Sequence, residues 1–254
     1  MQNFVNTFLS IFDRCYDDAA FPAVDTLSME QAYRIQADVI QQRIARGESI
    51  AGYKVGCTSS AIQSQFGLDE PIYGRVMNPF VMYGSCDLAI DEFHQPAIEP
   101  EFVVTIGKTI STPPQSDNEL IDAIDHVAPG IEIHHYKFWN GTPTIQELIA
   151  SNGLHASVIV GTNHIDARDV DWDSEQIRVL NHNNQIAAGC ASDIMGGPLR
   201  SLNWLISHLH ANGTHLTEGD IVIPGSATEL IRVDSGDSIT ASFSGIGAVR
   251  VNFQ

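Results

Sequence analysis

Two glutamates interrupt an otherwise apolar run, Ile98-Glu99-Pro100-Glu101-Phe102-Val103-Val104. The β-branched and aromatic residues of this run predict a buried strand. Residues i and i+2 of a strand project to the same face, so Glu99 and Glu101 share one face and Pro100 takes the other. Buried carboxylates are costly unless a cation or hydrogen bonds compensate them. The stretch therefore predicts a β-rich core that encloses a charged site.

Two further strand-like motifs each carry one charged residue. Glu132 lies in Pro129-Gly130-Ile131-Glu132-Ile133, and Lys54 lies in Gly52-Tyr53-Lys54-Val55-Gly56. Three carboxylates with no Cys or His in the same motifs suit Mg²⁺ or Mn²⁺ better than Zn²⁺. The alternative is a set of acids on solvated strand faces, because 31 of 254 residues are acidic.

Composition limits the classes of partner. The net charge of −18 argues against nucleic-acid binding and against attachment to an anionic membrane. The N-terminus lacks the basic start of a signal peptide, and no stretch approaches the ~18 apolar residues that cross a bilayer. We expect a cytoplasmic protein. Its cysteines contain no Cys-x-x-Cys pair and are expected to be reduced thiols: Cys15, Cys57, Cys86 and Cys190.

Periodicity predicts helices at the N-terminus. Apolar residues recur at helical spacing over residues 4–20 and 28–46, and Ser28 with Gln31 fits a capping box at the second start. Residues 1–50 therefore form a predicted helical arm. Two later helices are expected: one from Ser116 with apolar positions through Val127, and one from Pro198 to Gly213.

Short β-like runs dominate from residue 51 to residue 254. They predict strands at 53–57, 97–106, 130–134, 156–161, 177–180, 221–223, 238–243 and 248–253. With the two interrupting helices, this pattern indicates one α+β domain behind the N-terminal helical arm.

Five blocks follow one another along the chain: GYKVGCTS at 52–59, DEPIYGR at 69–75, IEPE at 98–101, PGIEI at 129–133 and GDIVIPGS at 219–226. They occur in the order found in the 2-keto-4-pentenoate hydratases and 4-oxalocrotonate decarboxylases of the fumarylacetoacetate hydrolase superfamily. The chain resembles that group from about residue 28 to its C-terminus.

The resemblance implies a mixed, rolled β-structure in which residues 51–254 form the catalytic domain. It also implies Mg²⁺ or Mn²⁺ bound by Glu99, Glu101 and Glu132, with Lys54 as the acid-base residue. The metal is expected to chelate the carboxylate and 2-oxo oxygen of a small 2-oxo acid. The implied reaction hydrates 2-hydroxypenta-2,4-dienoate to 4-hydroxy-2-oxopentanoate, and a nearby dication should lower the pKa of Lys54.

Four further residues are candidates for substrate binding. Arg75 follows a Tyr-Gly turn and has a fork suited to a carboxylate, although a surface arginine is the alternative. Ser226 offers a hydroxyl beside Gly225, although a plain turn explains it equally. Asn152 matches an asparagine of the hydratases, and His155 follows it closely.

The chain departs from the hydratase pattern after Glu132. Hydratases usually have Asp-Ser-Arg where this chain has His135-Tyr136-Lys137, which leaves the identity of the substrate open. On a period of two, His134 shares the face of Glu132 and His135 takes the opposite face. A catalytic or metal role and a structural role are both open for these histidines.

Three other interpretations compete with hydration. A decarboxylase acting on 2-oxo-3-hexenedioate (4-oxalocrotonate) would use the same metal and Lys54. A C–C hydrolase is disfavoured, because those enzymes resemble one another in an early His-Glu dyad and this chain has no histidine before His94. A non-catalytic partner protein is disfavoured because all four site residues are present. Homo-oligomerisation is expected by analogy alone.

Overall fold

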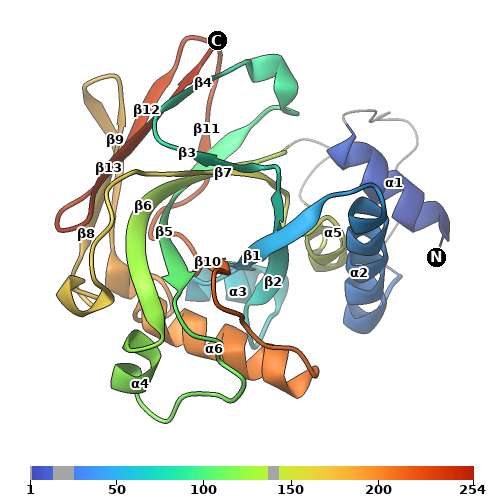
Figure 1. Ribbon diagram of the computed structural model, residues 1–254. Helices are drawn as coiled ribbons and strands as arrows, with labels where there is room; N and C mark the ends of the chain where they lie inside the picture. Colours follow the sequence, from blue (N-terminus) through green and yellow to red (C-terminus); the bar gives the residue numbers. More distant parts are fainter. Residues whose placement is uncertain (1, 14–25, 137–142) are drawn as a thin grey trace.

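The computed structural model describes residues 2–13, 26–136 and 143–254 (Figure 1). In these ranges no helix has the length and apolar character needed to cross a membrane. The α-helices are α1 (Gln2–Phe12), α2 (Met29–Ala45), α3 (Ser60–Phe66), α4 (Asp117–Ile121), α5 (Ile145–Ala150) and α6 (Pro198–Ala211). Three short 3₁₀ turns, η2, η3 and η4, span Ile90–Glu92, Ala167–Asp169 and Ala191–Asp193.

The strands form two sheets. The larger sheet has the order β2-β1-β10-β5-β6-β7-β3, with β11 paired to β5, and the smaller has the order β4-β13-β12-β8-β9. Strands of the larger sheet are β1 (Ser49–Gly56), β2 (Ile72–Asn78), β3 (Val81–Tyr83), β5 (Ala97–Ile106), β6 (Ile124–His134), β7 (His155–Val160), β10 (Ile221–Ile223) and β11 (Ile231–Arg232). Those of the smaller sheet are β4 (Cys86–Leu88), β8 (Gln176–Asn181), β9 (Asn184–Cys190), β12 (Ser238–Phe243) and β13 (Gly247–Phe253).

The larger sheet curls so that its two edges approach each other, as Figure 1 shows. Strand β2 at one edge contacts β3 and β7 at the other. The sheet is mixed, because β1 pairs in parallel with β10 and antiparallel with β2. The predicted α+β fold with a rolled, mixed β-structure is confirmed.

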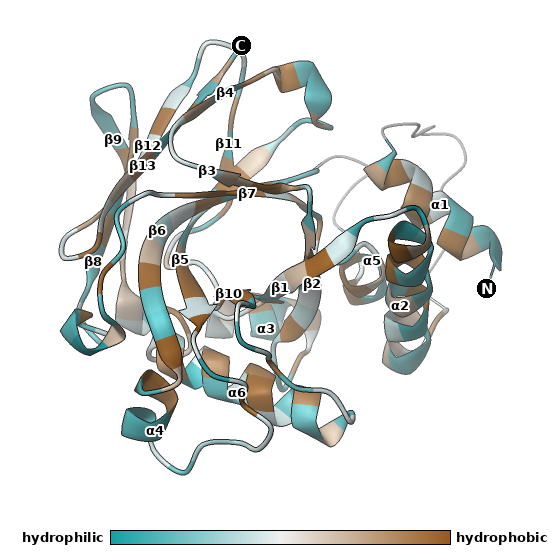
Figure 2. Ribbon diagram, viewed as in Figure 1, coloured by the Kyte–Doolittle hydropathy of each residue, from teal (hydrophilic) through white to brown (hydrophobic). Residues whose placement is uncertain are grey.

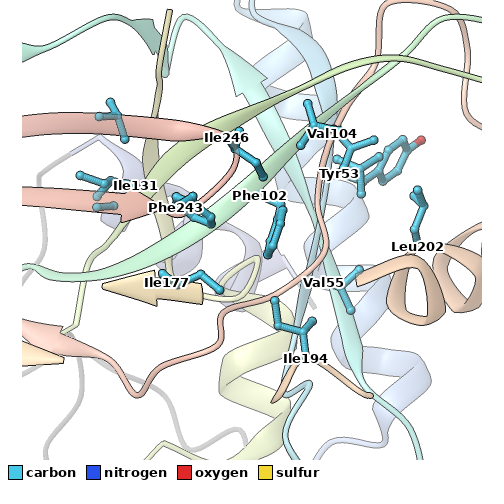
Figure 3. Close-up of a cluster of buried hydrophobic side chains, with 14 of the residues drawn as sticks. Tyr53, Val55, Phe102, Val104, Ile131, Ile177, Ile194, Leu202, Phe243 and Ile246 are labelled. Carbon is cyan, nitrogen blue, oxygen red and sulfur yellow. The ribbon is translucent and has the colours of Figure 1, made fainter. Parts of the chain in front are cut away.

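The main core lies between the two sheets and α6. Phe102 of β5 meets Phe243 of β12 edge to face, with ring centroids 5.1 Å apart, and Leu202 of α6 joins the same cluster (Figure 3). The alternate residues of β5 face the inner side of the curl, where Val103 packs with Val158 and Ile223. The period of two in β5 therefore separates this core from the inner face.

A second apolar cluster joins the N-terminal helices to the rest of the chain. Helices α1 and α2 pack with α5, and Phe8 and Ile35 are fully buried there. Figure 2 shows α2 with both hydrophobic and hydrophilic stretches, as expected of an amphipathic helix. The predicted capping box between Ser28 and Gln31 is confirmed. The division of the chain at residue 50 stays a prediction.

Two predictions fall partly outside the described residues: the first helix and the cysteines. The helix predicted for residues 4–20 ends at Phe12, and residues 14–20 lie outside the described part. Of the cysteines, Cys57, Cys86 and Cys190 are free thiols, whereas Cys15 lies outside the described residues.

The helix predicted from Ser116 through Val127 is wrong in its second half. Ser116 caps α4 by accepting from the Glu119 amide, but α4 ends at Ile121. Val127 instead belongs to β6, pairs with Val104 of β5 and is fully buried. Burial of a β-branched residue in a central strand outweighed the local helical pattern.

Gly52 of β1 lies at a close contact with the neighbouring strand β10, where it pairs with Ile221. A Cβ at this residue would lie 1.8 Å from the carbonyl oxygen of Ile221. We expect Gly52→Ala to lower the free energy of unfolding by about 3 kcal/mol or more, since overpacking and backbone strain each cost ~1–3 kcal/mol. Gly47→Ala is the control, because Gly47 also has positive φ but nothing within 4 Å. Equal losses in urea titrations of the two variants would contradict the close strand contact.

Candidate metal centre and active site

Strands β5 and β6 place two carboxylates directly opposite each other. Glu99 pairs with Glu132 in the antiparallel register, and Glu101 pairs with Gly130. Like charges directly opposite on neighbouring strands destabilise a sheet. Glu132 is 0% exposed, so water does not relieve this repulsion. The pair requires positive charge nearby.

Lys54 supplies one positive charge from across the curl. Its Nζ lies 2.8 Å from Glu132 Oε1 and donates a hydrogen bond to the Gly153 carbonyl at 3.3 Å. Strands β10 and β5 separate β1 from β6 in the sheet, so a flat sheet would place β1 and β6 roughly 14 Å apart. The ion pair therefore depends on the curl.

Two histidines flank the same carboxylate. His155 Nδ1 lies 2.8 Å from Glu132 Oε1, which thus contacts both His155 and Lys54. On the other side, His134 Nε2 lies 3.0 Å from Glu99 Oε2 and 3.5 Å from Glu132 Oε2. His134 shares the face of Glu132, as the period of two predicts. His135 lies elsewhere, where its Nδ1 accepts from the His94 amide.

Glu101 is held differently from the other two glutamates. Its Oε2 accepts a hydrogen bond from the Gly225 amide at 3.1 Å, and it is 1% exposed. Burial, together with the charges of Glu132 and Glu99, raises the pKa of Glu101 well above its ordinary value. The charged form of Glu101 is therefore less favoured than that of an exposed glutamate.

Lys54 and Glu132 stabilise each other's charged forms. Burial alone lowers the pKa of Lys54, but the Glu132 and Glu99 charges outweigh it and the pKa is raised. Burial alone raises the pKa of Glu132, but His134 and Lys54 outweigh it, so the pKa falls below its usual range. The carboxylates alone therefore raise the pKa of Lys54, whereas the sequence predicted a lowered pKa. A dication bound nearby would act against the carboxylates and lower the pKa of Lys54.

Three ligand atoms converge at one point beside this ion pair. One atom each from Glu99, Glu132 and His134 lie within 4.8 Å of one another. Glu132 Oε2 and both ring nitrogens of His134 are buried without a hydrogen-bond partner. Orphaned buried acceptors that face one another fit a cation between them. This group contains His134 and lacks Glu101. It therefore differs from the predicted metal-binding set of Glu99, Glu101 and Glu132.

Arg75 is not brought into the cluster. Its guanidinium donates to Gln36 Oε1 at 2.8 Å and lies over the Tyr73 ring. In the β1–β2 register Gly74, not Arg75, is the partner of Lys54. Since neighbouring residues of a strand point to opposite faces, Arg75 and Lys54 lie on different sides of the sheet.

Ser226 lies beside Glu101, with which it forms an isolated β-bridge. Its Oγ accepts from the Thr228 amide at 3.2 Å. The preceding Gly225 has φ +118°, and a Cβ there would lie 2.5 Å from Thr58 Cγ2. This turn brings the Gly225 amide to Glu101, a contact that the sequence motif did not indicate.

Asn152, in the turn before β7, clamps the edge strand β2 to the far side of the curled sheet. Its Oδ1 accepts from the Arg75 amide at 2.7 Å and its Nδ2 donates to the Arg75 carbonyl at 2.8 Å. Asn152, Gly153 and Leu154 all have positive φ, and this tight turn directs the Gly153 carbonyl to Lys54. Asn152, which matches an asparagine of the hydratases, therefore holds the turn that positions Lys54.

We expect Asn152→Ala to lower the free energy of unfolding by about 2 kcal/mol, because two partly buried backbone groups of Arg75 would lose their partners. Asn118→Ala is the matched control, since Asn118 is exposed and surface changes usually stay within about 0.5 kcal/mol. Urea denaturation measures both. A loss for Asn152→Ala no larger than that of the control would contradict the clamp.

Comparison with known proteins shows the family of this chain. Residues 69–254 match the family described as Fumarylacetoacetate (FAA) hydrolase C-terminal. The chain belongs to the fumarylacetoacetate hydrolase family. It is 25% identical to a 2-keto-4-pentenoate hydratase of Paraburkholderia xenovorans over 90% of this chain and 85% of that protein.

Two further similar proteins are named as decarboxylases. A 4-oxalocrotonate decarboxylase of Pseudomonas putida is 27% identical over 89% of this chain and 86% of its own. A solved 4-oxalocrotonate decarboxylase from Pseudomonas putida G7, complexed with magnesium and adipate, has TM-score 0.90 and 24% identity, and covers 100% of this chain and 98% of its own. At that identity the structural likeness shows the fold alone.

Proposed function

We propose that this protein is a divalent-metal-dependent hydratase of 2-hydroxypenta-2,4-dienoate or a related small 2-oxo acid. The observation that carries the proposal is the buried Lys54–Glu132 pair beside the ligand atoms that converge with Glu99. Relatives named as hydratases support the reaction class. A resident Mg²⁺ or Mn²⁺ fits the carboxylates and the orphaned Glu132 Oε2.

The proposed roles follow from the contacts. Glu99 and Glu132 hold the cation, with Glu101 beside them, and the bound dication would chelate and polarise the substrate's carboxylate and 2-oxo oxygen. Glu132 Oε1 orients Lys54 and His155. Lys54 Nζ, held by Glu132 Oε1 and the Gly153 carbonyl, is the group that we propose acts on the bound substrate.

The reaction balances with water as the only co-substrate. The 2-hydroxyl proton is lost and a proton is added at C5, which converts the dienol to an enone. Water then adds its oxygen to C4 and a proton to C3, giving 4-hydroxy-2-oxopentanoate. Lys54 moves a proton in these steps or donates a hydrogen bond to the developing enolate oxygen. Burial of Lys54 and Glu132 excludes bulk water from their charged groups.

Substrate contacts and surroundings are also proposals. Ser226 beside Glu101, and His155 through its free Nε2, are proposed to contact the substrate. Arg75 and Asn152 were predicted for the same role, and we propose instead that both act on the scaffold that positions Lys54.

The surface charge supports a protein without nucleic-acid or membrane partners, and we propose a cytoplasmic homo-oligomer.

The test starts with protein stripped of metal by EDTA. We expect 2-hydroxypenta-2,4-dienoate to be stable with this protein and to lose its dienol absorbance when Mg²⁺ or Mn²⁺ is restored, with 4-hydroxy-2-oxopentanoate detected by NMR. Metal-dependent release of CO₂ from 2-oxo-3-hexenedioate without hydration of the dienoate would overturn the hydratase proposal in favour of a decarboxylase. Turnover that is unaffected by EDTA would overturn the metal dependence.

A further inference from the structure

His134 is placed among the carboxylates in a way that the proposed hydratase reaction does not use. It lies on β6, two residues after Glu132 and on the same face. Its ring is 3% exposed, and its Nε2 lies 3.0 Å from Glu99 Oε2 and 3.5 Å from Glu132 Oε2. The nitrogen thus points at the space that the two carboxylate oxygens share.

Hydrogen bonds do not account for this placement. Neither ring nitrogen of His134 has a partner with hydrogen-bond geometry, and Glu132 Oε2 also lacks one. A buried polar atom without a partner is destabilising. One cation placed between Glu99 Oε2, Glu132 Oε2 and His134 Nε2 would satisfy all three atoms at once.

The other nearby groups are already engaged. Glu132 Oε1 contacts Lys54 and His155, so Oε2 is the oxygen left for a cation. The Glu101 carboxylate accepts from the Gly225 amide and stands outside the convergent group. The atoms directed at one point are therefore two oxygens and one imidazole nitrogen.

We propose that His134 is a metal ligand and that it makes this centre a mixed nitrogen and oxygen site that prefers a transition-metal dication to Mg²⁺. This inference rests on the proposed metal site of the hydratase and adds a ligand to it. Mg²⁺ takes oxygen ligands in octahedral geometry, whereas imidazole suits transition metals. Two carboxylates with one imidazole therefore favour Mn²⁺, Co²⁺ or Zn²⁺.

The first experiment detects the ligand directly. Metal-free protein is loaded with one equivalent of Mn²⁺ and measured by pulsed electron paramagnetic resonance, which reports ¹⁴N nuclei bound to the ion. We expect ¹⁴N coupling from one imidazole in the wild type, and loss of that coupling in His134→Ala. The control, His215→Ala, changes an exposed histidine and should keep the coupling. A bound Mn²⁺ without ¹⁴N coupling in the wild type overturns the proposal even if His134→Ala fails to fold.

Calorimetric titration then tests the preference. We expect His134→Ala to weaken Mn²⁺ binding by about tenfold or more and to change Mg²⁺ binding much less. Tighter metal binding in His134→Ala would overturn the proposal, because it would mean that the imidazole occupies the cation's position. Metal-dependent hydration by a protein whose metal has only oxygen ligands would overturn the role of His134 and leave the proposed function intact. A wild-type protein that binds no metal would overturn both the role of His134 and the proposed function.

Discussion

Lys54→Met is expected to lower kcat for dienoate hydration by about 10²–10⁴-fold, the range typical of a positioned acid-base group. The wild-type Nζ lies 2.8 Å from Glu132 Oε1 and is buried beside the convergent ligands. Methionine keeps an unbranched chain but removes the ammonium. Steady-state kinetics at saturating Mn²⁺ measures the effect.

The same variant separates chemistry from metal binding. Removal of a positive charge beside a dication should leave the metal dissociation constant unchanged or lower it. Lys108→Met is the matched control, since Lys108 is exposed, and it should keep wild-type kcat. Full activity in Lys54→Met, or a metal-free Lys54→Met protein under saturating Mn²⁺, would contradict the assigned role.

Glu132→Gln is expected to weaken Mn²⁺ binding by more than about 100-fold, because it removes a charged ligand, and losing even an outer partner costs 10–100-fold. Glu132 is the residue that joins the parts of the site: Oε1 contacts Lys54 and His155, and Oε2 faces Glu99 and His134. Loss of its charge therefore affects the metal and the lysine together.

Thermal unfolding with and without Mn²⁺ measures this loss. Metal that binds the folded state raises the stability of the wild type according to its concentration relative to the dissociation constant. We expect that rise in the wild type and in Glu218→Gln, an exposed control, and no rise in Glu132→Gln. A metal-dependent rise of equal size in Glu132→Gln would show that the ion binds elsewhere.

The sequence predicted the strands that carry the site. The run around Glu99 and Glu101 has a period of two that separates a charged face from an apolar one, and β5 has the predicted bounds. Local periodicity was sufficient there because burial and strand propensity agree. Val127 shows the opposite case, where a helical pattern continued into a strand that only its pairing with Val104 explains.

The motifs named Glu99, Glu132 and Lys54, which the fold brings close together, but they did not indicate the surroundings of these residues. Which carboxylates converge depends on the curl of the sheet and on the Gly225 amide that takes Glu101, and neither follows from residue spacing. Arg75 and Asn152 carry suitable polar groups, but the Arg75 guanidinium contacts Gln36 of α2 and the Asn152 side chain binds the Arg75 backbone. The period of two correctly placed His134 on the face of Glu132, but its contact with Glu99 follows only from the pairing of β5 with β6.

The most direct measurement is a crystal structure of the protein grown with Mn²⁺ and a saturated 2-oxo acid, with anomalous data collected for manganese. We expect one strong anomalous peak bound by Glu99 and Glu132, with the carboxylate and 2-oxo oxygen of the acid completing the coordination and Lys54 beside them. A protein that is active with Mn²⁺ but shows its peak away from Glu99 and Glu132, or shows none, would contradict the assignment of this cluster as the catalytic centre.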